Sequence, residues 1–317
     1  MTDNKSTCAY KTSIGGQALM EGILMRGPKK QAIVCVGKDS LIEKVEDLKY
    51  TKEKYPILGV PFIRGCFIFI SSLVNGMQAL TYSADMLPEE DQEEPDAIDR
   101  WITEHFPEEK AKKLIIGTAV VLGIALSMFL FVFLPAFLVG LIKPLTERYF
   151  VRNVSEGFVR VVILMLYMYL CSKEKDVRRV FAYHGAEHKT IFCYEHGKPL
   201  TVENVRPESR FHPRCGTSFL IVVVLVSILV NSVVRTPNTW ARIGCHLLLL
   251  PVVVGISYEI NRWCGKHDNK LSAVLSAPGK WLQRITTFEP DDKMIACAIR
   301  AMELVIPEEK GTDAWGE

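Results

Sequence analysis

The chain has 317 residues, 49% of them hydrophobic, and its 38 Lys and Arg residues nearly balance its 36 Asp and Glu residues, giving a net charge of +2. This balance argues against a nucleic-acid partner. The length alone would allow two soluble domains, but the apolar residues gather in long uncharged runs. The composition therefore excludes an ordinary soluble protein and indicates a multi-pass membrane protein.

The N-terminus and the cysteines indicate the compartment. The first residues, "MTDNKSTCAYK", have no apolar core behind a basic start, so we expect no cleavable signal peptide. The nine cysteines are odd in number and include no CxxC pair. A reducing compartment without a disulfide framework fits this usage.

The N-terminal 57 residues are expected to form a cytoplasmic β element. "QAIVCV" at 31–36 and "LIEKVE" at 41–46 have the composition of strands, and the turn-rich "GKDS" joins them. The preceding "GGQALMEGILMRGP" at 15–28 contains four glycines, which favour tight turns or close backbone packing. It also contains Glu21 and Arg26, which we expect to pair while this segment packs near the histidine-rich segment described below.

Two stretches precede the first clear membrane span. Residues 58–82 contain a solid apolar run that polar residues and glycines interrupt, so the stretch can span the membrane, enter it partway or lie flat at its surface. Residues 83–113 are acidic and punctuated by proline. We expect this second stretch to be a solvated connector with one short helix around residues 98–105.

Four apolar runs predict transmembrane helices. They lie at 114–142, 157–171, 217–234 and 243–258. The first contains no charge over 29 positions, which is more than a hydrocarbon core of ~30 Å requires. We therefore expect tilt, or a bend at Pro135.

One ion pair is expected at the edge of the second run. Arg160 stands four residues after Glu156, and this spacing places both side chains on one helix face. Because an arginine near the end of a span can reach the membrane surface, we expect an interfacial ion pair without a function of its own.

The distribution of basic residues predicts the topology. The segment 172–216 holds nine of them: Lys173, Lys175, Arg178, Arg179, Lys189, Lys198, Arg206, Arg210 and Arg214. Both termini are also lysine-rich, whereas the loops at 143–156 and 235–242 carry few basic residues. Four spans place every strongly basic segment in the cytoplasm, while a fifth span at 58–82 would place 172–216 outside. We therefore expect 58–82 to be an interfacial or re-entrant helix and both termini to be cytoplasmic.

The segment "HGAEHKTIFCYEHG" at 184–197 holds three of the seven histidines. We expect the helix of the second span to continue into this segment, which places His184 and His188 on one helix face with Glu187 beside them. The order H-x-x-E-H matches the inverted zincins, in which two imidazoles hold zinc and the glutamate is the base. Gly185 weakens a helix by ~1 kcal/mol, and a polar loop merely rich in histidine is the alternative.

A zinc site needs at least a third protein ligand. "HPRC" at 212–215 offers His212 and Cys215 just before the third span, and a Cys/His set suits zinc or another borderline divalent metal. Arg210 and Arg214 belong to a group of arginines that make this surface electropositive and suited to anionic headgroups or a phosphorylated substrate. Topology alone explains the same arginines.

Residues 261–317 follow the fourth span and are expected to end in an amphipathic helix. Pro290 sits in its first turn, two aspartates follow at the positive end of the helix dipole, and Thr287 or Glu289 can cap it. One stripe consists of Ile295, Ala298, Ile299, Met302 and Val305. We expect this stripe to pack against the protein's own cytoplasmic part.

Together these features predict a mainly α membrane protein. It has about four transmembrane helices within residues 114–260, with the His/Cys loop 172–216 on the cytoplasmic side. One interfacial or re-entrant helix and a small cytoplasmic α+β part complete the expected fold.

The sequence resembles the YqhQ family of bacterial membrane proteins over nearly its whole length. The resemblance rests on "GGQALMEGILMRGP" at 15–28, "YHGAEHKTIFCYEHGKPLTVENVRPESRFHPRCGTSFL" at 183–220, "GISYEINR" at 255–262 and "LQRITTFEP" at 282–290. That family has no established biochemical activity, and its description as a metal-dependent enzyme rests largely on the histidine motif. The resemblance implies a bacterial plasma-membrane location, Glu187 as the catalytic residue, and a metal held by ligands from the set His184, His188, His212 and Cys215.

Two functions of different classes are compatible with these features. The first is a membrane-bound metal-dependent hydrolase that acts at the cytoplasmic face on a lipid-linked or membrane-peptide substrate, with Glu187 activating a water on zinc. The second is a non-catalytic membrane adaptor or scaffold that docks membrane protein partners and uses the His/Cys cluster structurally. We do not expect a transporter, because the predicted spans lack paired polar residues and broken-helix repeats.

Overall fold

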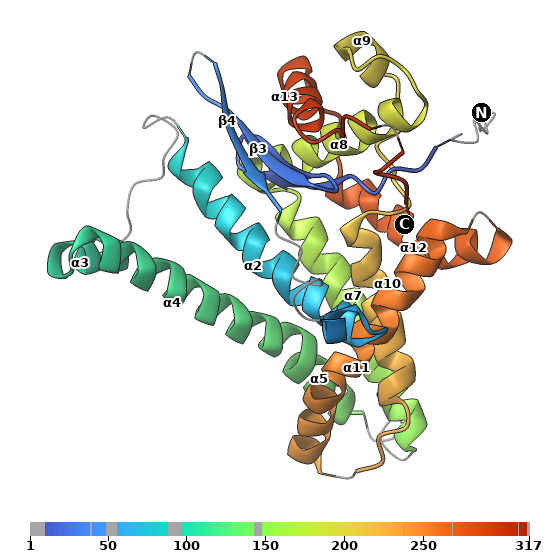
Figure 1. The fold of residues 1–317 in the computed structure, drawn as a ribbon. Helices are drawn as coiled ribbons and strands as arrows, with labels where there is room; N and C mark the ends of the chain where they lie inside the picture. Colours follow the sequence, from blue (N-terminus) through green and yellow to red (C-terminus); the bar gives the residue numbers. More distant parts are fainter. Residues whose placement is uncertain are drawn as a thin grey trace. The chain divides into compact units, whose positions relative to one another are not determined.

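A computed structural model describes residues 10–38, 40–48, 56–87, 97–142, 148–236, 238–267, 269–309 and 311–315. The chain divides into two compact units, each assembled from segments that are far apart in the sequence. The first unit comprises residues 1–88, 167–226 and 251–317, and the second comprises residues 89–166 and 227–250. Figure 1 shows the helices and strands of both.

The first unit contains a four-stranded antiparallel sheet with the strand order β1-β2-β3-β4. Its strands are β1 Gly15–Leu19, β2 Gly22–Arg26, β3 Lys30–Val36 and β4 Leu41–Asp47. The strands predicted at 31–36 and 41–46 are confirmed as β3 and β4. The glycine-rich segment before them, expected mainly to turn, forms the hairpin of β1 and β2, and Glu21 adopts a φ of 47° at its tip.

The remaining elements are helices. The first unit contains η1 Pro56–Gly59, α2 Ile63–Asp85, α8 Lys175–Glu195, α9 Val202–Val205, α12 Lys270–Thr286 and α13 Asp292–Glu303. The second contains α3 Ala97–His105, α4 Glu108–Met128, the π-helical turn η3 Phe129–Phe133 and α5 Leu134–Gly140. Three helices contribute to both units, namely α7 Tyr149–Cys171, α10 Gly216–Asn231 and α11 Thr239–Lys266. The short helix expected near residues 98–105 is α3, while residues 88–96 of the acidic connector lie outside the described residues.

Helices cover both faces of the sheet, and this explains why β2 reads "GILM" without a polar residue before Arg26. Ile23 and Met25 belong to a buried cluster that includes residues of α8 and α13. Leu24, between them in the strand, points to the other face and packs with Ala79 of α2. The sheet therefore separates α8, which carries the histidines, from α2 (Figure 1).

The structure confirms the amphipathic helix predicted near the C-terminus. This helix is α13, and the stripe, which continues past its end to Val305, is buried against the sheet and α8. The cap is Asp291, whose side chain accepts a hydrogen bond from the Met294 backbone N–H at 2.9 Å, and not Thr287 or Glu289 as expected. The preceding helix, α12, was not predicted, although Asn269 begins it with a capping box.

Within the described residues, four helical segments are long and apolar enough to cross a membrane. They are Ile63–Asp85, Glu108–Gly140, Tyr149–Cys171 and Trp240–Lys266. Three of them contain the runs predicted to span, and the first coincides with the ambiguous 58–82 stretch. The remaining predicted span, 217–234, corresponds to α10, a shorter apolar helix of 16 residues.

Pro135 produces the irregularity expected within the first long apolar run. A π-helical turn, η3, stands directly before α5. Proline has no N–H, so Pro135 cannot donate the usual α-helical hydrogen bond to the carbonyl of Phe131, four residues earlier. Arg160 of α7 donates to this oxygen from Nε at 2.6 Å and to the Ser227 hydroxyl from Nη1 at 3.1 Å.

Glu156 forms ion pairs with arginines other than the predicted Arg160. Its Oε1 lies 3.3 Å from Nε of Arg152 and 3.1 Å from Nη2 of Arg242. The side chains of Glu156 and Arg242 are each only 2% exposed. The helical spacing that predicted the Glu156–Arg160 pair is real, but the carbonyl near Pro135 engages that arginine instead.

The expected continuous helix through the second span and the histidine segment is wrong. α7 ends at Cys171 and α8 begins at Lys175. Glu174 starts the new helix, because its carboxylate accepts hydrogen bonds from the backbone N–H groups of Asp176 and Val177 at 2.8 Å each. This break gives α8 a direction of its own, so it packs on the sheet.

Candidate metal centre

The buried half of α8 carries His184, Glu187 and His188. The helix continues through Gly185, which the sequence suggested would weaken it. A Cβ atom at Gly185 would meet the carbonyl oxygen of Phe288 at 2.0 Å, so only glycine lets the chain after α12 lie against α8. The ~1 kcal/mol that glycine costs a helix is therefore offset by this close approach.

His184, His188 and Cys215 form a compact group. One ligand atom from each lies within 4.8 Å of the others. Nε2 of His184 is 3.0 Å from Sγ of Cys215, and the two imidazole centroids are 4.3 Å apart. The i, i+4 spacing on α8 aligns the histidines, and Cys215 reaches them because it stands directly before α10.

Backbone carbonyls orient both imidazoles. Nδ1 of His184 lies 2.9 Å from the Thr286 oxygen, and Nδ1 of His188 lies 2.6 Å from the Arg210 oxygen. A carbonyl only accepts hydrogen bonds, so each Nδ1 carries a proton. Burial lowers the pKa of His184, but the Cys215 sulfur beside its Nε2 outweighs burial and raises the pKa to about 9, so without a metal ion this ring pairs with the thiolate as an imidazolium. A metal ion that binds here displaces the proton on Nε2. Nε2 of His188 is buried and has no hydrogen-bond partner within the described part of the chain. An unpaired buried nitrogen of this kind fits a metal ligand whose orientation is already fixed.

Cys215 completes the group as a sulfur donor. Burial by itself raises its pKa, but the imidazoles of His184 and His188 outweigh burial and hold the pKa of Cys215 well below its ordinary value. The Thr217 backbone N–H donates to the sulfur at 3.4 Å. The low pKa favours the thiolate, which is the form of cysteine that binds metal ions.

Glu187 lies beside the group and is held by the N-terminal segment. Its Oε1 accepts a hydrogen bond from the Gly16 backbone N–H at 2.9 Å. Burial raises the pKa of Glu187, although the imidazoles of His184 and His188 oppose this effect. The contact confirms the prediction that residues 15–28 pack near the histidine segment.

His212, the other predicted third ligand, occupies a neighbouring polar cluster. Its Nε2 is 3.7 Å from Oε2 of Glu195 and 3.3 Å from Nη2 of Arg214, and those two residues form a buried ion pair. Burial lowers the pKa of His212 to about 4, so its ring is neutral. Of the two alternatives, the structure brings the Cys215 sulfur to Nε2 of His184, whereas the His212 ring packs against His188 with the two ring centroids 5.5 Å apart and turns its Nε2 toward Glu195.

Glu21 and Arg26 do not pair with each other. Glu21 forms an ion pair with Arg179 of α8 and accepts a hydrogen bond from the Tyr183 hydroxyl at 3.1 Å. Arg26 stands at the far end of β2, five strand positions or roughly 16 Å away. The two residues therefore serve different parts of the unit: Glu21 fastens the hairpin to α8, and Arg26 lines a separate cleft.

Several groups that build the site escaped the sequence analysis. Gln283 is fully buried and bonds the backbone N–H and carbonyl of His212 at 2.8 and 2.7 Å. Thr286 supplies the carbonyl that orients His184, and Arg210 donates to the Thr287 carbonyl at 2.6 Å. Gln283, Thr286 and Thr287 belong to the segment "LQRITTFEP" at 282–290, but no local pattern marks a backbone carbonyl as a hydrogen-bond partner.

A cavity of about 80 Å³ adjoins the group. Glu187, His188 and Cys215 line it, together with Gly15, Gly16 and Trp315. This volume accommodates an ion and a few water molecules but no organic substrate. A reacting group must therefore reach the cavity from a neighbouring surface.

Comparison with known proteins identifies the family. A family model described as "Protein of unknown function (DUF1385)" matches residues 60–308. The chain belongs to the DUF1385 family. It is also 32% identical over 305 residues to "Uncharacterized protein YqhQ" of Bacillus subtilis (strain 168), and the match covers 95% of this chain and 93% of the relative. No solved structure matches. The expected resemblance to YqhQ is thus confirmed at the level of the family, and the matched range of the DUF1385 model includes the His/His/Cys group.

Proposed function

We propose that this DUF1385 protein is a membrane-bound, zinc-dependent hydrolase that acts at the cytoplasmic membrane face. One observation carries the proposal: Nε2 of His188 is buried without a hydrogen-bond partner among the described residues, beside His184 and Cys215. Three protein ligands with a fourth position open are typical of catalytic zinc sites.

The surrounding residues support a division of roles. His184, His188 and Cys215 hold the ion, and the carbonyls on both Nδ1 atoms keep Nε2 available. When bound, zinc supplies a water that is activated for attack near neutral pH. Glu187 would accept and hold a proton on its carboxylate, because the Gly16 N–H fixes this carboxylate and its raised pKa suits proton transfer.

Metal analysis of the full-length protein, purified in a nonionic detergent without chelators, tests the proposal. We expect about one zinc ion per chain, lost in His184→Ala, His188→Ala and Cys215→Ala. His267→Ala and Cys66→Ala are matched controls outside the group and should retain the metal. Native protein that carries no stoichiometric metal would overturn the proposal of a zinc-dependent hydrolase.

Glu187→Gln separates a base from a ligand. The variant should keep the zinc ion and lose hydrolysis if Glu187 moves the proton. Loss of zinc in this variant would instead make Glu187 a ligand or a support for the ligands.

The small volume of the cavity supports a second candidate function. An enclosed group in which Nε2 of His184 already contacts Cys215 can act as a structural knot. The protein would then be a non-catalytic membrane adaptor that docks other membrane proteins. Stoichiometric zinc together with an unchanged phenotype of Glu187→Gln would favour this alternative.

We further propose a topology with four spans and with both termini in the cytoplasm of a bacterial cell. The sheet packs against α8, so both lie on one side of the membrane and the chain between them crosses an even number of times. Three apolar segments lie in between: α2, α4 with α5, and α7. Two of them cross, and the third enters and returns on the same side.

The packing of α2 supports its assignment as the re-entrant segment. Its last third, from Gly76 onward, contacts the sheet through Ala79 and through Gly76 itself, which abuts the side chain of Gln17. The remaining residues 63–75 reach only about 20 Å as a helix, which is less than a hydrocarbon core. The same parity argument applies between α8 and α13, so α10 crosses with α11 despite its 16 residues.

A further inference from the structure

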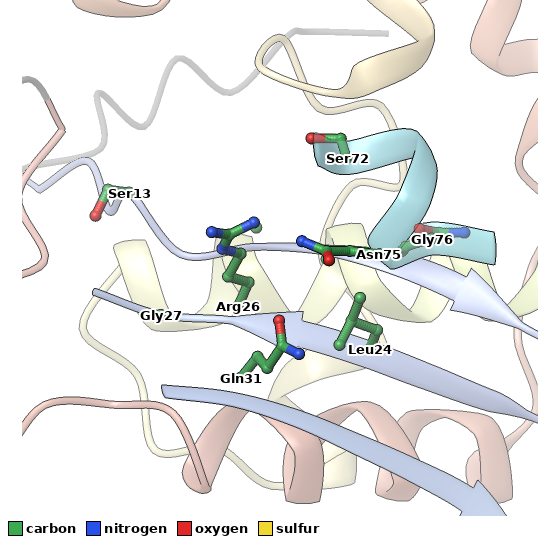
Figure 2. A pocket seen from close by; sticks show the side chains of 11 residues that line it. Ser13, Leu24, Arg26, Gly27, Gln31, Ser72, Asn75 and Gly76 are labelled. Carbon is green, nitrogen blue, oxygen red and sulfur yellow. The ribbon is translucent and has the colours of Figure 1, made fainter. Parts of the chain in front are cut away.

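A second hollow, of about 310 Å³, lies between the sheet and α2 (Figure 2). Polar side chains make up most of its lining, namely Ser13, Gln17, Arg26, Gln31, Ser72 and Asn75. In Figure 2, Arg26 and Gln31 extend from β2 and β3 toward the side on which Asn75 of α2 lies. We call this hollow the Arg26 cleft.

The chemistry of the Arg26 cleft favours an anion. Arg26 is the only charged residue among those that line it, all of which the structure describes, and no carboxylate is among them. The Gln31 amide already donates one hydrogen bond to Glu46 at 2.8 Å, and its second N–H, the other amides and the hydroxyls can each donate to a ligand. A guanidinium with several such donors is typical of sites for a phosphate or carboxylate group.

An exposed apolar stripe on α2 adjoins the cleft. Ile70, Leu73, Val74 and Met77 follow i, i+3, i+4, i+7 spacing and are 60%, 58%, 50% and 42% exposed. Polar residues from the same turns of α2 line the cleft. Since α2 is apolar enough to enter a bilayer, acyl chains are the cover that this stripe fits.

Two glycines connect the Arg26 cleft with the candidate metal centre. Gly15 and Gly16 line both the cleft and the small cavity at Glu187. The N–H of Gly16 holds the Glu187 carboxylate. A ligand anchored at Arg26 therefore lies next to the backbone that positions the candidate base.

We propose that the Arg26 cleft binds the phosphate-bearing headgroup of an anionic lipid whose acyl chains lie along the α2 stripe. That the bound lipid is also the substrate rests on the proposed hydrolase function. Binding itself depends only on Arg26, the donors around it and the stripe.

Native mass spectrometry of the full-length protein in dodecyl maltoside micelles tests this inference. Dioleoyl phosphatidate should be retained, whereas dioleoylglycerol, which lacks the phosphate, should not. Inorganic phosphate alone should bind far more weakly than phosphatidate, and Leu73→Gln/Met77→Gln should weaken phosphatidate binding. Inorganic phosphate that bound as tightly as phosphatidate would show that the stripe contributes nothing and would overturn the lipid assignment.

Point variants locate the binding. Arg26→Gln removes a charged donor and should weaken phosphatidate binding about tenfold to hundredfold. Gly15→Leu should also weaken binding. A Cβ at Gly15 meets nothing within 4 Å, so the new side chain extends into the open space of the cleft that Gly15 lines and occupies room for the ligand. The matched controls are Arg178→Gln on α8 and Gly117→Leu on α4, where a Cβ also meets no neighbour. Wild-type affinity in Arg26→Gln and Gly15→Leu, or an equal loss in the controls, would overturn the proposal.

Chelator-treated protein distinguishes this inference from the proposed function. Phosphatidate binding should persist after removal of the metal, since no cleft residue is a candidate ligand. If the protein binds phosphatidate but never carries zinc, the lipid proposal stands and the hydrolase proposal is overturned. If it carries zinc but binds no phosphatidate, only the lipid proposal is overturned.

Discussion

Gly185 lies in the middle of α8 with the carbonyl oxygen of Phe288 directly against it. The segment that approaches there also brings the Thr286 carbonyl to Nδ1 of His184. Pro135 acts in a comparable way, because it cannot donate a hydrogen bond to Phe131 O, to which Arg160 donates. At both positions the atom that the residue lacks lets a distant residue approach the helix backbone.

Gly185→Ala should destabilise the protein by about 1–3 kcal/mol, because the new methyl group forces the backbone at Phe288 away from α8. Thermal unfolding in detergent measures the change. Gly117→Ala, at an open helical position on α4, is the control and should be neutral or gain up to ~1 kcal/mol from better helix propensity. Equal stability of the two variants would show that the approach of Phe288 is not tight.

Glu156→Gln should destabilise the fold by about 3–5 kcal/mol, because it leaves the buried guanidinium of Arg242 without its ion partner. Glu109→Gln removes an exposed pair with Lys113 on α4 and should change little. Chemical or thermal unfolding of both variants in the same detergent provides the comparison. A small effect at Glu156 would mean that Arg242 finds another partner.

At the scale of elements, length and hydropathy do not separate the helices that we propose to cross the membrane from α2, which we propose to be re-entrant. α2 passes the same criteria as α4, α7 and α11, whereas α10 falls short of them. Packing favours a different assignment, because the part of α2 from Gly76 onward contacts the sheet through Ala79, and the residues before it are too few to cross a hydrocarbon core as a helix. The two criteria give different topologies that labelling can tell apart.

Single cysteines in a cysteine-free background test the four-span topology. Cysteines introduced at Lys38, Glu203 and Glu309 should resist a membrane-impermeant maleimide in intact cells and react after lysis. A cysteine at Arg235, in the loop between α10 and α11, should react in intact cells. Labelling of Glu203→Cys from outside would contradict the topology and require α2 to cross.

At the scale of the molecule, the two ends of the described chain meet next to the candidate metal centre. Thr12 Oγ1 donates to the buried carboxylate of Asp313 at 2.6 Å, and the backbone N–H of Trp315 donates to the Lys11 carbonyl at 2.9 Å. The N–H of Thr12 also donates to Glu195 of α8 at 2.9 Å. Residues more than 300 positions apart thus position the polar cluster that surrounds His212.

Asp313→Ala should cost about 1–3 kcal/mol, because the Thr12 hydroxyl and the Tyr10 hydroxyl lose their acceptor in a buried place. Thr312→Ala, at the exposed neighbouring position, should have little effect. Unfolding in detergent measures both. A neutral Asp313→Ala variant would mean that the contact between the chain ends does not hold the fold together.

Features that depend on neighbours along the chain could be predicted from the sequence alone. The long uncharged runs, the strands β3 and β4, the stripe of α13 and the shared face of His184 and His188 all follow from local spacing. Those local rules also named His212 and Cys215 as candidate third ligands. They did not choose between the two, since both precede the third predicted span by only a few residues.

Tertiary structure decided that choice and the other long-range pairings. The Cys215 sulfur, and not a ring nitrogen of His212, joins the ligand atoms of His184 and His188. Gln283 of α12 fastens His212 through its backbone, so its ring packs against His188 while its Nε2 faces Glu195, and no sequence pattern had predicted α12. Glu21 binds Arg179 because the sheet stacks on α8, whereas the extended strand separates it from Arg26. Periodicity fixes which residues share a face of one element, but only packing between distant elements determines which faces meet.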